Sequence, residues 1–103
     1  MSVVFAPTGA TVNVAAPAAT SESVALTGLT GIAGGVVRVY NATDVLQFVE
    51  FGAGSATAVA ASSLPIASGA VEYIEVGPSI THAAAIESAT SEGAIYFTSG
   101  QAR

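Results

Sequence analysis

The residues of this chain that could do chemistry are few, and they stand far apart. His82 is the only histidine, Arg38 and Arg103 are the only basic residues, and among the seven acids only Glu72 and Glu75 lie close together. A single histidine in a chain without cysteine does not form an ordinary zinc site. Serines are abundant, but no Gly-x-Ser-x-Gly sequence accompanies His82, so we expect it to close a loop instead of acting as a general base.

Glu72 and Glu75 are the nearest approach to a pair of catalytic carboxylates. They lie in VEYIEV (71–76), which has the composition of a strand. Residues three apart in a strand point to opposite faces, so the two carboxylates do not share a substrate. Calcium requires clustered oxygen ligands, which the sequence does not show. We therefore predict no catalytic, metal or cofactor site and no enzymatic activity.

Arg38 lies in VVRVYN (36–41), where strand alternation places it on one face with Val36 and Tyr40. Its guanidinium could bind an anion or pair with a glutamate such as Glu50 across a hairpin. We favour the ion pair, with the aliphatic stem lying over apolar neighbours.

The composition sets the surroundings in which these residues act. Charged residues make up 9% of the chain and the net charge is −5, whereas an average domain is roughly 25% charged. This balance disfavours nucleic-acid binding. No apolar run reaches the ~18 residues of a membrane span, and no signal peptide is recognised at the start. A surface of Ala, Thr, Ser and Gly is typical of a domain that covers its exterior with other subunits, which predicts a homo-oligomer.

The elements that must position these residues are short β-prone runs separated by turn residues. The expected strands are 22–27, 36–41, 45–51, 57–62, 71–76 and 94–99, with a loop at 63–69 and either a strand or one helical turn at 82–88. No apolar stripe at helical spacing persists. Strands at intervals of about ten residues predict an all-β fold, a single antiparallel β-sandwich of jelly-roll or immunoglobulin-like type.

Residues 36–51 are expected to form a hairpin around a turn from Asn41 to Asp44, because Asn and Asp side chains bond nearby backbone amides. Period-two patterning then predicts which side chains reach the core. These are Val37, Val39, Val49 and Phe51 of the hairpin, with Phe48 as the alternative to Phe51, together with Ile74 and Phe97.

Residues 1–21 contain no charge and two prolines. A disordered tail is one interpretation, but the β-prone residues favour an extended N-terminal arm, part of it strand, beside a sandwich domain at 22–103. We expect the arm to order on a neighbouring copy or another partner, and its deletion to leave the domain's melting temperature nearly unchanged. The expected interface residues are Val3, Val4, Phe5, Val12, Val14 and Arg38.

Three stretches resemble small virion structural proteins of tailed bacteriophages. They are GGVVRVYNATDVLQFVEFG (34–52), SSLPIASGAVEYIEVGPSITHAAAIES (62–88) and GAIYFTSGQ (93–101). The shared features are a strand ending in Asn, an F-V-x-F-G strand, an L-P-I-x-x-G loop, a T-H-x-A-A-I segment and a final Y-F-T-x-G. These are core and turn patterns, so no site residue carries over.

The resemblance implies a virion component, above all a capsid cement (decoration) protein that binds the major capsid protein on the capsid surface after synthesis in the host cytoplasm. A trimer is favoured, because threefold positions on an icosahedral shell select that symmetry. The alternatives are a head–tail connector or tail subunit, which would form a ring, and a glycan-binding β-sandwich, which would require exposed aromatic side chains.

Overall fold

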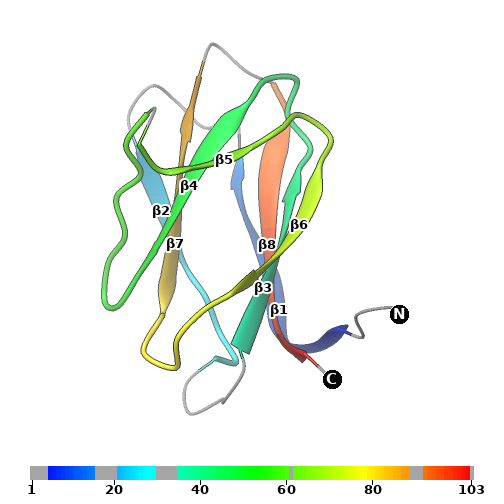
Figure 1. The fold of residues 1–103 in the computed structure, drawn as a ribbon, viewed down its shortest axis with the longest axis vertical. Coiled ribbons are helices and arrows are strands. Elements are labelled where there is room, and N and C mark those ends of the chain that lie inside the picture. The colour runs from blue at the N-terminus through cyan, green and yellow to red at the C-terminus, as the bar shows by residue number, and fades with distance from the viewer. Residues whose placement is uncertain (1–4, 16–20, 30–34, 61, 89–91, 103) are drawn as a thin grey trace.

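The computed structural model describes residues 5–15, 21–29, 35–60, 62–88 and 92–102. These residues form strands and connecting loops without a helix, and they make up two four-stranded sheets (Figure 1). The all-β prediction is confirmed. The strands are β1 (Phe5–Ala15), β2 (Glu22–Ala25), β3 (Gly35–Asn41), β4 (Gln47–Gly52), β5 (Leu64–Ile66), β6 (Val71–Glu75), β7 (His82–Glu87) and β8 (Ala94–Ala102).

The first sheet, sheet A, has the strand order β1-β8-β3-β6, and the second, sheet B, has the order β2-β7-β4-β5. All the paired strands are antiparallel. The pairs are nested, since β1 pairs with β8, β2 with β7, β3 with β6 and β4 with β5. The chain therefore follows the path of one long hairpin that is folded over on itself, with its first and last strands side by side.

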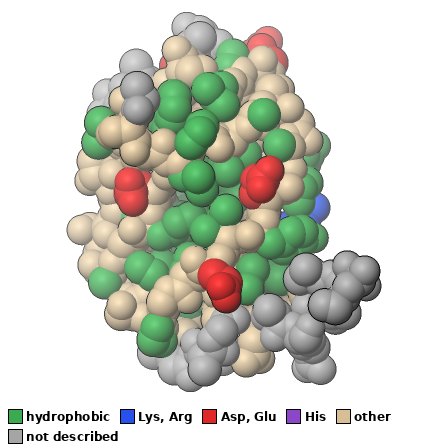
Figure 2. Space-filling view, in the orientation of Figure 1, with side chains coloured by type: hydrophobic (Ala, Val, Ile, Leu, Met, Phe, Trp, Pro, Cys, Tyr) green, Lys and Arg blue, Asp and Glu red, His purple; other side chains and the backbone are tan. Residues whose placement is uncertain are grey.

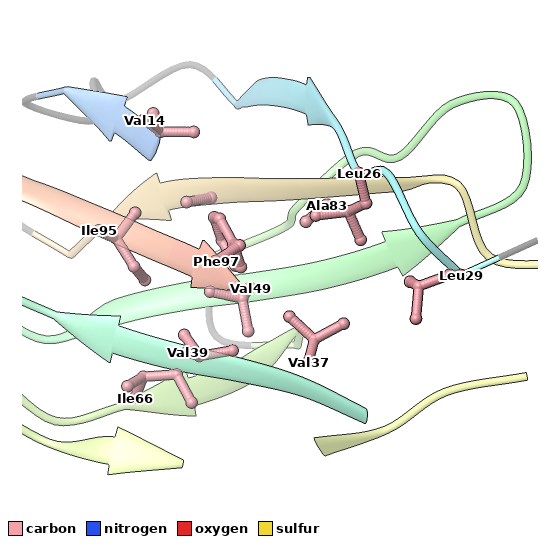
Figure 3. Close-up of a cluster of buried hydrophobic side chains, with 11 residues drawn as sticks. Val14, Leu26, Leu29, Val37, Val39, Val49, Ile66, Ala83, Ile95 and Phe97 are labelled. Atoms are coloured by element: carbon pink, nitrogen blue, oxygen red, sulfur yellow. The ribbon is translucent and has the colours of Figure 1, made fainter. Parts of the chain in front are cut away.

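The two sheets enclose one apolar core (Figure 3). Sheet A contributes Val37, Val39, Ile95 and Phe97, all 0% exposed, and sheet B contributes residues such as Val49. The predicted burial of Val37, Val39, Val49 and Phe97 is confirmed. Further predicted core residues are only partly buried: Phe51 and Ile74 pack against the edge of this core, and Phe48 is half-buried.

The predicted hairpin at 36–51 is wrong. Strand β3 belongs to sheet A and β4 to sheet B, so the two strands face each other across the core and do not pair. The turn chemistry itself is as expected, because the Oδ1 atom of Asn41 accepts a hydrogen bond of 3.0 Å from the backbone N–H of Thr43. The same buried amide donates to the carbonyl of Ile66 at 2.9 Å, which ties the turn to β5 of the other sheet. A tight turn fixes the local reversal of the chain but not which sheet the next strand joins.

The predicted strand at 57–62 and the predicted loop at 63–69 are exchanged in the structure. The described residues of the predicted strand 57–62 form a loop, and the predicted loop 63–69 contains the short strand β5. Ile66 of β5 is 1% exposed, whereas Val59 is 52% exposed. The alternating Ala and Val pattern at 57–60 therefore does not mark a buried strand face. Residues 82–87 form the strand β7, which settles the choice left open between strand and helical turn.

The N-terminal segment forms a regular strand of sheet A. Strand β1 pairs with β8 from Phe5 to Ala15, with a shift of register between Pro7 and Thr11. Val14 is 3% exposed and belongs to the core. The extended conformation expected for this segment is present, but an arm that orders only on a partner is not confirmed, because β1 finds its partner strand within its own chain.

Candidate interaction surface

The outer surface of sheet A gathers all three tyrosines of the chain. Register aligns Tyr40 of β3 with Tyr96 of β8, and two residues earlier on β3 it aligns Arg38 with Tyr73 of β6 and Thr98 of β8. Because Val37 and Val39 point into the core, these residues point outward. We call this surface the tyrosine face and define it by Tyr40, Tyr73, Tyr96 and Arg38, with Phe5, Thr11, Val71, Glu75 and Thr98 around them.

The aromatic side chains of the tyrosine face contact one another in two pairs. The rings of Tyr40 and Tyr96 stack with centroids 6.1 Å apart, and the rings of Phe5 and Tyr73 lie 5.4 Å apart at a tilt of 58°. Aromatic pairs at such separations stabilise beyond their area of burial, by about 0.5–1.5 kcal/mol. Tyr73 nevertheless remains 49% exposed and its neighbour Val71 39% exposed. The face is thus held in place by its own chain and still presents apolar surface to solvent.

Phe5 reaches across this face because Gly100 leaves it room. A methyl group added at Gly100 would overlap the Phe5 ring and the backbone oxygen of Ala6. The ring extends over β8 toward Tyr73 on β6, and Val36 on the intervening strand is buried although it points outward. The predicted interface residue Phe5 therefore contributes to the tyrosine face through contacts within its own chain.

Arg38 lies in the middle of the tyrosine face without a carboxylate partner among the residues that the structure describes. Its guanidinium carbon is 5.9 Å from the centroid of the Tyr40 ring, a cation–π contact. The expected ion pair with Glu50 is wrong, because Glu50 lies on β4 of sheet B and accepts a hydrogen bond of 2.9 Å from the hydroxyl of Ser63. The false hairpin was the sole reason to place these two residues together.

The outer surface of sheet B differs because the connection between β4 and β5 covers part of it. Ala84 points outward, since Ala83 and Ala85 are in the core, yet it is 0% exposed. Ala58 of the connecting loop is also buried, and its backbone N–H donates to the hydroxyl of Ser21 just before β2 at 2.8 Å. The Ser63 bond to Glu50 holds the other end of the loop. This face is therefore covered in part by its own chain.

The remaining chemistry-bearing residues stay apart. His82 is half-buried, and its Nδ1 lies 2.8 Å from the hydroxyl of Thr81, which also accepts from the N–H of Gly54. Register places Glu72 opposite Val39 and Glu75 opposite Val36, so the two carboxylates point to opposite faces of β6 as predicted. Figure 2 shows acidic side chains separated from one another among apolar and uncharged ones. Within the described part of the chain there is no pocket and no cluster of metal-binding side chains.

The structure does not place the other residues expected at an interface on the tyrosine face. Val3 and Val4 are outside the described residues, Val12 packs against the core and Val14 lies within it. The tyrosines, by contrast, were not singled out from the sequence. Alternation within each strand indicates that Tyr40 shares a face with Arg38, but only the pairing of β3 with β6 and β8 brings Tyr73 and Tyr96 beside them.

Across the described ranges, no helix has the length and apolar character needed to cross a membrane. No protein-family model matches this chain, and no curated protein matches it either. Its geometry shows two packed antiparallel sheets, one with an outer face partly covered by a loop and the other with an exposed tyrosine face.

Proposed function

We propose that this chain is a non-enzymatic structural protein of a tailed-bacteriophage virion, a capsid cement protein that binds the shell of the major capsid protein. The observation that carries the proposal is the open tyrosine face on a two-sheet scaffold. Tyrosine and arginine are among the side chains enriched where protein surfaces bind each other. A cement protein requires such a surface and a rigid fold but no reacting groups.

The strand order supports a jelly roll as the form of the sandwich. Nested pairing of β1 with β8, β2 with β7 and β3 with β6 gives two sheets that each combine early and late strands. A long hairpin rolled into two sheets produces this order, and jelly rolls occur in viral capsid proteins and lectins. Fold alone does not assign the function. The strand order is compatible with the virion proposal and adds to the resemblance of residues 34–101.

The charge distribution agrees with a role in close packing. Sheet A carries Arg38, Glu72 and Glu75 on β3 and β6 and no charged side chain on the described part of β1. Charged groups are depleted from the cores of protein interfaces, because burying a charge without a partner costs free energy. A sheet with so few charges can pack against another protein surface at low desolvation cost.

A glycan-binding module is the second candidate, and the tyrosine face is the specific observation that favours it. Aromatic rings presented on a flat sheet face can stack on sugar rings. However, Tyr40 and Tyr96 stack on each other, which leaves Tyr73 as the most exposed ring. A glycan array separates the two candidates, because a cement protein gives no signal that depends on Tyr73.

The test of the cement proposal is an add-back experiment with virions that lack the protein. Purified protein should bind the empty sites on the shell at saturable stoichiometry and raise the temperature at which the heads release DNA. The Arg38→Glu substitution, which places an additional negative charge on the tyrosine face, should weaken this binding. Binding only at the head–tail junction or along the tail would identify the connector or tail alternative, and absence of binding to any virion would refute the proposal.

A further inference from the structure

The positive charge of Arg38 on the tyrosine face has no carboxylate partner among the described residues. Arg38 is half-buried among aromatic side chains. The chain has seven acids and a net charge of −5, so a carboxylate partner would have been available. A guanidinium that is partly removed from water is stabilised by an anion, which points to a carboxylate supplied from outside the chain.

The same face carries a carboxylate of its own at Glu75. Register pairs Arg38 with Tyr73 and Val36 with Glu75, so Glu75 lies one strand away from Arg38 and two residues further along. With strands about 4.8 Å apart and a rise of about 3.4 Å per residue, their backbone positions are about 8 Å apart. Glu75 is exposed, and Tyr73 lies beside both residues. The face therefore presents one positive and one negative group on either side of its most exposed ring.

We propose that the tyrosine face binds a second copy of this chain across a twofold axis near Tyr73. In a twofold contact each residue meets its counterpart reciprocally. Arg38 of each copy then meets Glu75 of the other, and the two Tyr73 rings pack together at the axis. Long side chains can span the diagonal between Arg38 and Glu75 of one copy, but Arg38 contacts the Tyr40 ring instead. Across the twofold axis both charges gain a partner.

A second copy fits this surface better than an unrelated acidic partner because the face is self-complementary in charge. An acidic partner would satisfy Arg38 but would be repelled by Glu75. The loop between β4 and β5 covers part of the other outer face, and the most exposed aromatic ring, that of Tyr73, lies on the tyrosine face. Four strands span about 15 Å, which makes this contact small, and we expect a dimer that dissociates on dilution in the micromolar range.

The dimer is inferred for the free protein, since binding to a shell through the same face would compete with it, and it is tested with the purified full-length chain alone. Sedimentation equilibrium is measured from about 1 to 500 µM for the wild type and for Arg38→Glu, Glu75→Arg and the double charge swap. Each single reversal should weaken dimerisation at least about tenfold, because it sets like charges opposite each other. The double swap should restore the wild-type constant to within a few-fold.

Glu72→Arg is the matched control. It makes the same charge change on the same strand as Glu75→Arg, but on the opposite face of β6. The dimerisation constant of Glu72→Arg should equal that of the wild type. Tyr73→Ala tests the ring at the axis and should weaken the dimer as strongly as the charge reversals. Circular dichroism and thermal melting establish that each variant is folded.

Three results would overturn the proposal. They are a wild type that stays monomeric throughout the concentration range, a trimer whose stability is insensitive to Arg38 and Glu75, and equal effects of Glu72→Arg and Glu75→Arg. The trimer would agree with the symmetry expected for a shell and would leave the proposed cement function standing, so the two proposals fail separately. If one of these variants is unfolded, Tyr73→Phe tests the packing of the ring, because it removes only the hydroxyl. Tyr73→Phe should dimerise like the wild type. Loss of the dimer in folded Tyr73→Phe would refute packing by the ring.

Discussion

The two outer faces of this molecule are built from the same kind of strand and have different surroundings. On sheet B, the outward-pointing Ala84 is fully buried. The loop between β4 and β5 (Figure 1) is held by hydrogen bonds between Ala58 and Ser21 and between Ser63 and Glu50. On sheet A, Tyr73 is 49% exposed and Arg38 has no carboxylate partner among the described residues. One face is covered in part by its own chain, and the other presents its most exposed aromatic ring to solvent.

The difference follows in part from the small outward residues beside the loop, although sheet B also carries the half-buried Phe48 and Ile86 on its outer side. Ala84 and Gly52 on sheet B allow the backbone of a connecting loop to approach the strands closely, and a methyl group at Gly52 would overlap the loop at Ser55. Tyr40 and Tyr96 occupy the corresponding space on sheet A with stacked rings. Small residues beside the loop let it approach sheet B, whereas an exposed aromatic side chain such as Tyr73 is suited to contact with a partner.

The largest effect should come from deleting residues 2–20, which removes β1 from the open sheet. This exposes the edge of β8 and removes Val14 from the core and Phe5 from the tyrosine face. We expect a loss of about 3 kcal/mol or more in the free energy of unfolding, and a melting temperature at least about 12 °C lower. Thermal melting of the isolated domain is the measurement. A wild-type melting temperature would instead support an arm that orders only on a partner.

A smaller effect is expected from Gly100→Ala, which disturbs the open face without touching the core. The added methyl group would displace the Phe5 ring, and overpacking of this kind costs about 1–3 kcal/mol. Gly77→Ala is the matched control, because a methyl group there meets nothing within 4 Å. Urea unfolding compares the two variants. Equal stabilities would mean that Phe5 does not pack over Gly100.

Ser63→Ala tests the cover of sheet B. The Ser63 hydroxyl donates to Glu50 and accepts from the N–H of Val59 at 2.9 Å, so its removal should cost about 1 kcal/mol. Limited proteolysis between residues 53 and 60 should become faster, while self-association through the tyrosine face stays unchanged. Ser62→Ala, at the exposed neighbouring position, should match the wild type in both assays. A change of association in Ser63→Ala with the fold intact would contradict the separation of the two faces.

The smallest effects are expected for Glu72→Gln and His82→Ala. Glu72 is exposed on the edge strand β6 and points away from the tyrosine face, and His82 contacts the hydroxyl of Thr81 beside it. We expect melting temperatures within about 3 °C of the wild type and unchanged assembly. Differential scanning calorimetry and sedimentation check these two outcomes. A loss of assembly in either variant would place a partner-binding site outside the tyrosine face.

The candidate site could be predicted only in part. Alternation along residues 36–41 places Arg38 and Tyr40 on one face and Val37 and Val39 on the other, as the structure has them. The aromatic neighbours of Arg38 on the adjacent strands could not be predicted from this alternation. Tyr73 and Tyr96 are 35 and 58 residues further along the chain than Arg38, and a strand pattern carries no information about which distant strand lies beside it.

The sequence by itself determined the class of the fold, because Gly, Pro, Asn and Asp interrupt the chain at intervals too short for helices, and the runs between them suit strands. It also determined the inward side of β3, because side chains alternate with a period of two along any strand. The tertiary structure decided that β3 and β4 lie in different sheets, that Phe5–Ala15 joins the sheet as β1, and that the tyrosines meet on one face. These outcomes depend on the pairing of strands distant in sequence, which is set by burial of one shared core and not by the residues of any single strand.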